Sequence, residues 1–352
     1  MKKVLYVTLM SVLSGAAYAQ SSVTLYGDIG GGLRWTNGAK GGSVVGFNNN
    51  IIAGNQFGFT GKEDLGNGLK AIFKLEGSFS SGTGAVKTSG TLFSQAAFVG
   101  LTGDFGRLTF GRQLNANEDF GILIDPSGGR GSSIAIEPGV VYSANYFTLD
   151  SRFNNTIKYL GQVGGFRFGA SYSPGGVAGN TRAGTNFSGA AMYQWGPALG
   201  GVSYQKTYNA AATQWAQTFQ TGGTLQIGPA RLYLNYADLT VTGATPGAPR
   251  RRDKIPGGGL VWVVTPSFQV TAAFTDDIAS DLGNVQSASG HKITTFAIAE
   301  YFISKQTELY AEVDRNGFSG AYRYDPANIT ALGLNPGGHG LTGVSVGLMT
   351  RF

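Results

Sequence analysis

The segment that decides the fold lies at residues 61–77, which read GKEDLGNGLKAIFKLEG. Asn67 and Gly68 tolerate the positive φ that a tight β-turn requires. After this turn, one face collects apolar side chains and the other polar ones: Leu69, Ala71, Phe73 and Leu75 against Lys70, Lys74 and Glu76. A period of two predicts a β-strand with one apolar and one polar face.

The same alternation recurs along the chain. In the first strand the apolar face carries Val23, Leu25, Ile29, Leu33 and Trp35, and the polar face carries Thr24, Tyr26, Asp28 and Arg34. It returns at residues 268–275 and 308–314. The helical period of 3.6 is almost absent, so the sequence predicts an all-β protein.

The connections between strands alternate in length. Short turns fall at residues 64–68, 102–106, 161–165, 194–200, 228–230, 265–267 and 304–306. Long polar loops fall at residues 36–55, 78–92, 113–152, 173–185, 208–216, 240–254, 277–289 and 316–338. Seven short turns alternating with eight long loops predict sixteen strands, with both chain ends on the short-turn side.

Two architectures could use such strands. A soluble sandwich or solenoid would bury its apolar faces against each other, with no reason for loops to alternate in length. A barrel in a bilayer turns its apolar face to lipid, and it must close because unpaired backbone groups are costly in hydrocarbon. The sequence therefore predicts a 16-stranded antiparallel transmembrane β-barrel with short periplasmic turns and long extracellular loops. A barrel of this width encloses an aqueous channel.

The composition agrees with this prediction and excludes several kinds of site. Glycine makes up 57 of 352 residues and charged residues only 13%, against usual values of about 7% and about 25%. Cysteine is absent and there are two histidines, His291 and His339, so thiolate and histidine metal sites are not expected. No metal or other cofactor is predicted.

Residues 1–19 have the pattern of a secretory signal peptide. Lys2 and Lys3 precede an apolar run, and Ala17-Tyr18-Ala19 resembles a cleavage site. The mature chain is expected to form a single barrel domain over residues 20–352. It would carry 24 basic and 20 acidic residues, a net charge of +4. This mild excess, without a large basic patch, does not indicate nucleic-acid binding.

Several motifs identify a family resemblance. They are residues 21–28 (SSVTLYGD), the hairpin at 61–71, residues 98–106 (FVGLTGDFG), 111–113 (GRQ), 301–305 (YFISK) and the terminal Phe352. In this order they resemble the trimeric general porins of Gram-negative outer membranes, of the betaproteobacterial type. The resemblance implies a homotrimer in the outer membrane, in contact with lipid and lipopolysaccharide, that passes small hydrophilic solutes and ions. Phe352 resembles the family's terminal assembly signal, although Met349 and Thr350 depart from the usual pattern.

The third long loop, residues 113–152, is about forty residues long, far beyond ordinary loops. The resemblance implies that it folds into the barrel and narrows the pore. Its acidic residues are Glu118, Asp119, Asp125 and Glu137. An acidic loop facing a basic wall would create a field across the passage, and charge and diameter are the two determinants of selectivity in such pores.

The basic wall is predicted from the polar faces of the strands. The candidates on this criterion are Arg152, Lys62, Lys74 and Lys158, whereas Arg34 is expected to be a solvated charge. Arg152 and Arg112 also match basic positions of the family, but Arg112 could face either the lumen or a subunit interface. Thr60 and Gln95 stand where the family usually has bases. The remaining bases and the +4 balance favour a weak anion preference.

Two other functions are compatible with a barrel of this kind. A barrel enzyme would need a base beside a nucleophile, and neither histidine lies in such a motif. A substrate-selective channel of the same shape, for sugars, dicarboxylates or phosphorylated solutes, stays open as the alternative. Arg250, Arg251 and Arg252 are expected at an exposed loop tip, either solvated or meeting lipopolysaccharide phosphates.

Overall fold

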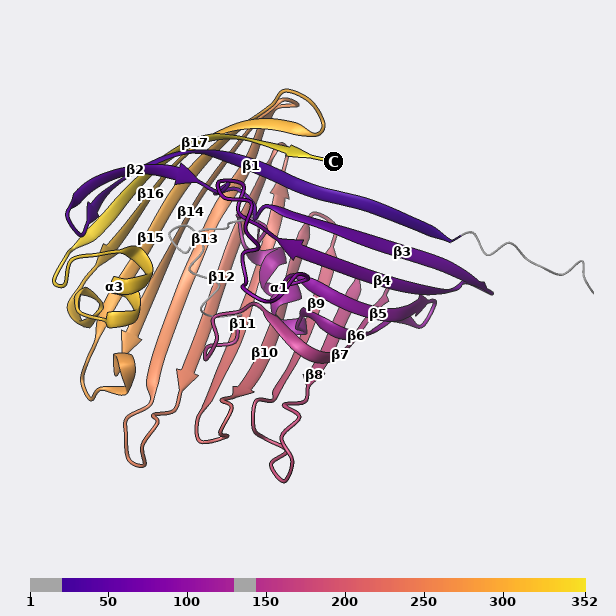
Figure 1. Ribbon diagram of the computed structural model, residues 1–352, viewed down its shortest axis with the longest axis horizontal. Helices are drawn as coiled ribbons and strands as arrows, with labels where there is room; N and C mark the ends of the chain where they lie inside the picture. The colour runs from indigo at the N-terminus through magenta and orange to yellow at the C-terminus, as the bar shows by residue number, and fades with distance from the viewer. Residues whose placement is uncertain (1–20, 130–143) are drawn as a thin grey trace, which may run out of the picture.

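The computed structural model describes residues 21–129 and 144–352, and the predicted signal peptide at 1–19 lies outside them. The described strands form one antiparallel sheet that closes on itself (Figure 1). Closure occurs at β1 (Ser22–Ala39), which pairs with β3 (Gln56–Gly66) along its first half and with β17 (Gly340–Arg351) along its second. The structure confirms the predicted closed barrel of sixteen strands and excludes a two-layered sandwich.

The other barrel strands follow one another around the wall. They are β4 (Leu69–Ser78), β5 (Ala96–Gly103), β6 (Gly106–Leu114), β7 (Arg152–Val163), β8 (Phe166–Ser173), β9 (Asn186–Trp195), β10 (Ala198–Tyr208), β11 (Trp215–Ile227), β12 (Ala230–Val241), β13 (Arg251–Thr265), β14 (Phe268–Ser280), β15 (Gly290–Phe302) and β16 (Thr307–Phe318). The helical segments are α1 (Ala116–Ile124), η1 (Leu282–Asn284), η2 (Gly320–Arg323) and α3 (Pro326–Leu332).

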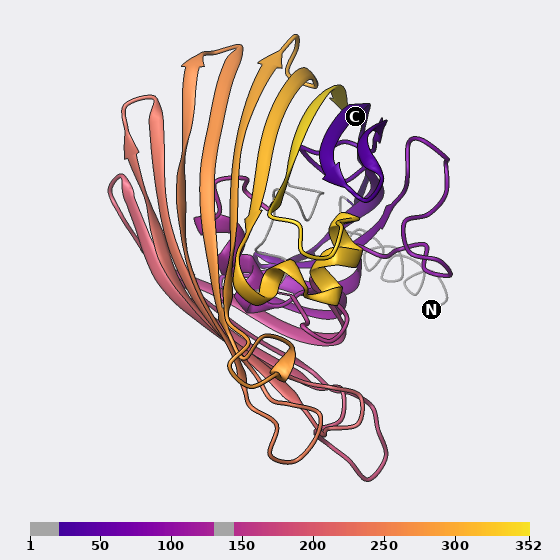
Figure 2. The same ribbon diagram turned by 90° about the vertical axis from the view of Figure 1, so that its left-hand side faces the viewer.

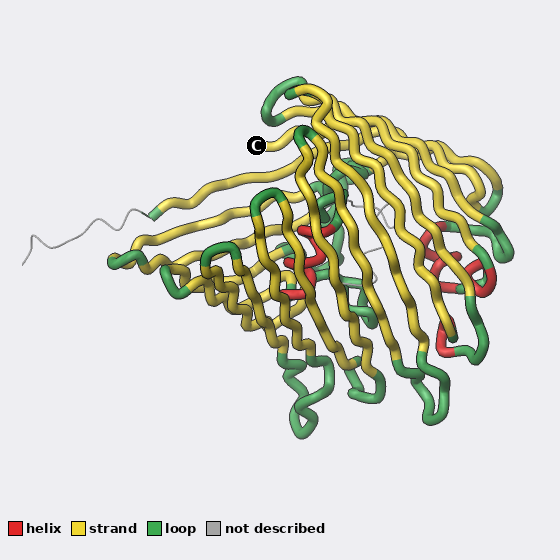
Figure 3. Tube along the Cα trace, turned by 180° about the vertical axis from the view of Figure 1, so that it is seen from behind, coloured by secondary structure: helices red, strands yellow, loops and turns green. Residues whose placement is uncertain are grey.

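The connections alternate in length as the sequence predicts. Seven turns join the strands at one end, and the long loops gather at the other, as Figure 3 shows at its upper left and lower right. In the turn between β3 and β4, Asn67 and Gly68 have φ of 52° and 77°, as the hairpin motif predicts. The first long loop adds β2 (Gly42–Asn48), which folds back on β1.

The apolar face of the wall points away from the lumen. Val99 is 58% exposed and Leu234 73% exposed, although both lie in the middle of regular strands. Polar residues of the opposite face are buried by loops that lie inside the barrel, as Ser203 and Asn186 are. Such an arrangement is stable only where lipid covers the outer face. Among the described residues, no helix is long and apolar enough to cross a membrane.

Two long loops pack against the wall. The segment with α1 enters the barrel, as Figure 1 shows. The loop between β16 and β17 carries η2 and α3, and Figure 2 places them at the lower ends of the yellow strands. Its Tyr322 and Leu334 form an apolar cluster with Ala279 of β14 and Phe318 of β16. Each loop thereby covers part of the channel.

Candidate functional site

The third long loop is attached to the inner wall through α1. Asn115 caps the helix by accepting a hydrogen bond from the backbone N–H of Glu118 at 2.9 Å. Its own amide donates to Gln205 Oε1 of β10 at 2.7 Å. At the other end of the helix, Asn235 of β12 donates to the carbonyl of Ile124 at 3.0 Å. Both ends of α1 are therefore bonded to the barrel wall.

Glycines in the wall make room for this helix. Phe120 and Ile124 of α1 are fully buried and pack with Met192 of β9. A Cβ built on Gly201 would lie 2.8 Å from Phe120, and one built on Gly222 would lie 2.9 Å from Ile124. Larger residues at these two positions would keep the helix off the wall. Close approach is thus one physical reason for the high glycine content.

Lys158 and Asp119 join the loop to the wall. Lys158 projects from β7, is 3% exposed, and places its Nζ 2.7 Å from Asp119 Oδ2 of α1. The same Nζ donates to the carbonyl of Leu114 at 2.8 Å. The acid and the base that were expected to face each other across the passage lie instead on the same side of it. This pair fixes the loop in place.

Two of the other predicted loop acids, Glu118 and Asp125, lie in α1 or at its end. Glu118 is buried within α1. Asp125 accepts hydrogen bonds from the backbone N–H groups of Ser127 and Gly129 just after the helix. Glu137 lies outside the described residues. A role in selectivity stays a prediction for these acids.

The strand register places Lys62 and Lys74 on the lumenal face, and their part in a pore constriction stays a prediction. The register pairs Thr60 with Lys74, and Thr24 with Thr60, so all three share that face with Tyr26. Lys74 Nζ lies 2.9 Å from Glu76 Oε2 and 5.5 Å from the ring centre of Tyr26. Lys62 is exposed and forms no ion pair within the described chain.

Arg152 does not share the lumenal face with Lys158, which corrects the prediction. Gly111 of β6 pairs with Thr156, but Gln113 pairs with Phe153, so β7 holds one extra residue between these rungs. Asn155, in the extra segment, has φ of 56°. A one-residue bulge reverses the alternation beyond it. Phe153 therefore takes the lumenal side, and Arg152 pairs with Leu114 on the other face.

Arg112 also lies outside the predicted pore wall. It is two residues from Phe110, which is 45% exposed on the outer face and pairs with Val99. Its guanidinium binds Asp150 at 2.5 Å and Asn154 at 2.7 Å, beside the β7 bulge. Of the two predicted orientations of Arg112, the lumenal one is therefore wrong. Arg112 lies on the outer face, where it joins the two ends of the third loop.

The structure adds Arg107 to the lumenal bases. Arg107 pairs with Thr102 and Leu160, and Arg167 pairs with Gln162, all on the lumenal face. Strict alternation within β6 could have identified Arg107. The lumenal face of β3–β8 then carries six bases and two acids: Lys62, Lys70, Lys74, Arg107, Lys158 and Arg167 against Asp64 and Glu76.

Several charges elsewhere on the lumenal wall form ion pairs. Arg34, expected to be a solvated charge, binds Glu312 at 3.1 Å and Asp314 at 2.6 Å. Arg351 lies 3.3 Å from Asp28 and 3.4 Å from Glu308. These ion pairs leave β3–β8 as the face with an excess of unpaired bases in the described chain.

The three successive arginines are split between the two faces, contrary to the expected loop tip. Arg251 is the first residue of β13 and is buried against Asp253 at 2.8 Å. Tyr322 of η2 contacts this arginine and donates to Asp277 at 2.5 Å, and burial raises the pKa of Tyr322 well above its ordinary value. Arg252 is on the outer face, 3.5 Å from Asp238. Strand β13 extends further than expected.

The histidine that the structure places in a strand has an acidic neighbour. His291 is on the outer face of β15, 3.1 Å from Asp276. Within the part of the chain that the structure describes, no three His, Asp or Glu residues are placed to hold a metal ion.

Comparison with known proteins relates the chain to bacterial porins. The family model described as "Gram-negative porin" matches residues 7–321. An outer membrane porin of Bordetella pertussis is 35% identical over 188 residues, which are 49% of this chain and 48% of that protein. Outer membrane porin protein 32 of Delftia acidovorans is 41% identical over 115 residues, 32% of each chain. The matched stretches thus span less than half the length of these curated relatives.

Solved structures share the fold over nearly the whole chain. The anion-selective porin from Comamonas acidovorans has a TM-score of 0.77 and 23% identity, over 95% of this chain and all of that one. The trimer form of OmpT from Vibrio cholerae has a TM-score of 0.69 and 14% identity, over 94% of this chain and 99% of that one.

Proposed function

Because the chain belongs to the Gram-negative porin family, we propose that it forms a water-filled channel through which small hydrophilic solutes and ions diffuse passively across the outer membrane. The observation that carries this proposal is the closed barrel with an apolar exterior and a charged lumen into which the third loop folds. In planar bilayers the purified protein should give stepwise conductance that grows linearly with voltage. Absence of conductance from correctly folded protein would refute the proposal.

The channel should prefer anions weakly. Lys74 and Lys158 are paired with Glu76 and Asp119, which leaves Lys62, Lys70, Arg107 and Arg167 without ion pairs in the described chain. Unpaired charges of one sign raise the local concentration of the opposite ion. A KCl gradient should therefore give a reversal potential of the sign produced by chloride permeation. A cation-selective potential would contradict this preference.

A substrate-selective channel of the same fold is the second candidate function. It predicts conductance that saturates or is blocked by its solute, whereas general diffusion predicts insensitivity. An apolar and basic cavity beside α1 favours testing organic anions first.

We further propose a homotrimer. Exposed apolar side chains, among them Val23, Leu25, Val45 and Phe47, lie on adjacent β1 and β2, and another copy could cover them. The solved OmpT from Vibrio cholerae includes a trimer form. Light scattering of the detergent-extracted protein should give three chains per particle. A monomeric mass with intact conductance would refute this assembly.

Lipopolysaccharide is the proposed lipid partner. Near the long-loop ends of β10–β13, the outer face carries Lys206, Arg252 and Lys254, and Arg250 lies over Trp215 at 5.5 Å. Bases and aromatic rings at this level suit lipid phosphates and the membrane interface. Replacing Arg252 and Lys254 by Gln should reduce the lipopolysaccharide retained after purification, and unchanged retention would contradict the proposal.

A further inference from the structure

A cavity of about 460 Å³ lies between α1 and the lumenal wall, next to the short turns. Strands β5–β9 supply the wall, and Asp119 and Leu123 supply the side made by the helix. Its strand residues, such as Arg107, Gln162 and Met192, share the lumenal face by register. The cavity is therefore reached from the channel.

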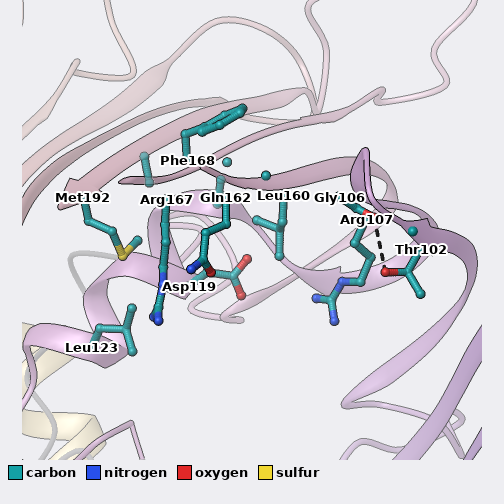
Figure 4. Close-up of a pocket in the computed structure, with 15 residues that line it drawn as sticks. Thr102, Gly106, Arg107, Asp119, Leu123, Leu160, Gln162, Arg167, Phe168 and Met192 are labelled. Atoms are coloured by element: carbon teal, nitrogen blue, oxygen red, sulfur yellow. Dashed lines mark hydrogen bonds between the residues drawn. The ribbon is translucent and has the colours of Figure 1, made fainter. Parts of the chain in front are cut away.

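Two arginines give this cavity its charge. Figure 4 shows the guanidinium groups of Arg107 and Arg167 projecting from their strands on either side of Asp119 and Gln162. Neither guanidinium forms an ion pair with another described residue, whereas Asp119 is neutralised by Lys158 at 2.7 Å. Two positive charges remain. Planar guanidinium groups bind carboxylates through two parallel hydrogen bonds.

Apolar side chains complete the lining. Leu123 of α1, Leu160 of β7 and Met192 of β9 face the same space, and Leu123 is 37% exposed. An inorganic anion would gain nothing from these surfaces. A ligand with a charged end and an apolar body would pair its charge with an arginine. It would also gain free energy by burying its apolar surface away from water.

We propose that this cavity binds small organic carboxylates. The arginines hold the carboxylate, and Leu123, Leu160 and Met192 hold its apolar chain or ring. The site lies beside the loop that narrows the channel, so a bound anion obstructs the current. The proposal rests on the channel function above and adds to it a class of solute.

The test is single-channel recording in KCl with benzoate, formate or inorganic phosphate added. Benzoate should reduce the chloride current in a saturable way, at a concentration about tenfold below that needed for formate, because its ring meets the apolar wall. Substituting both arginines, Arg107→Gln with Arg167→Gln, should raise the half-blocking benzoate concentration about tenfold or more. Leu123→Ser should narrow the difference between benzoate and formate while leaving formate block unchanged.

Arg231→Gln is the matched control. Arg231 is a lumenal base near a short turn of β12, outside this cavity, where it donates to Gln226, and its variant should be blocked like the parent protein. A parent channel that stays ohmic in benzoate, or one blocked equally by phosphate, overturns the carboxylate site. Either result leaves the diffusion channel standing, whereas loss of KCl conductance in the parent protein would defeat the channel function itself. If the arginine pair does not fold, the parent and Leu123→Ser recordings decide the question.

Discussion

At the scale of single residues, a lumenal lysine can either hold the third loop or face the channel, depending on whether an acidic side chain pairs with it. Lys158 and Lys62 are both lumenal lysines, but Lys158 is buried against an aspartate and Lys62 is exposed without one. A buried base with a hydrogen-bonded partner contributes to structure, whereas an exposed one acts on mobile ions. We therefore expect the buried, paired lysine to hold the loop and the exposed lysine to influence ion selectivity.

Removal of the Lys158 side chain should loosen the third loop. Lys158→Ala leaves Asp119 partly buried without its cation, and we expect a loss of about 2–3 kcal/mol in the free energy of unfolding. Urea titration of the detergent-solubilised protein measures this loss. Lys62→Ala serves as the control and should change stability by less than about 0.5 kcal/mol. Equal effects of the two substitutions would show that the ion pair is not an anchor.

A side chain at Gly201 should displace α1. The new Cβ of Gly201→Val would meet Phe120 at 2.8 Å and the carbonyl of Ala191 at 2.5 Å. Overpacking of this kind costs about 1–3 kcal/mol, and unequal conductance levels from a mobile loop should appear in bilayer recordings. Gly46→Ala is the control because a Cβ there meets nothing within 4 Å. Parent-like recordings from the valine variant would contradict the proposed close contact.

At the scale of elements, register decides what each side chain faces. A strand with unbroken alternation, such as β4, keeps its predicted faces, whereas the extra residue in β7 reverses them. The bulge lies at the base of the third loop, where it brings Asn154 next to Arg112. The strand irregularity and the loop attachment are thus parts of one local structure.

Single-cysteine scanning along β3 should reproduce the alternation. The chain has no cysteine, so each introduced thiol reports alone. In lipid bilayers, Thr60→Cys and Lys62→Cys should react with a charged thiol reagent through the aqueous lumen, whereas Phe59→Cys should not. Reaction rates that do not alternate would exclude an apolar exterior and a wet interior.

At the scale of the whole molecule, charge is distributed unevenly around the lumen. Helix α1 of the third loop packs against β8–β12, whereas bases without ion pairs remain on β3–β8. Arg34 and Arg351, by contrast, are neutralised by acids of neighbouring strands. An anion passing the loop would therefore meet a positive surface on one side. The mild net charge of the chain conceals this asymmetry.

Neutralising the basic face should change ion selectivity. Lys62→Gln combined with Lys70→Gln removes two of the four bases on β3–β8 that have no ion pair, and the reversal potential in a KCl gradient should move towards cation preference. Arg231→Gln, on the opposite part of the wall, should produce a smaller shift. A potential that is unchanged by the double substitution would indicate that selectivity is set elsewhere.

The sequence by itself determined the fold class, the number of strands and the lengths of their connections. Alternation of apolar and polar residues is a local property, and closure follows because backbone groups in lipid have no other partners. Tertiary structure alone decided which lumenal bases are paired, as with Lys158 and Asp119, and which face Arg152 takes. Ion pairs join residues that are far apart in the chain. A single bulge exchanges the two faces of a strand without any change in its polar pattern. Neither can therefore be deduced from the spacing of residues.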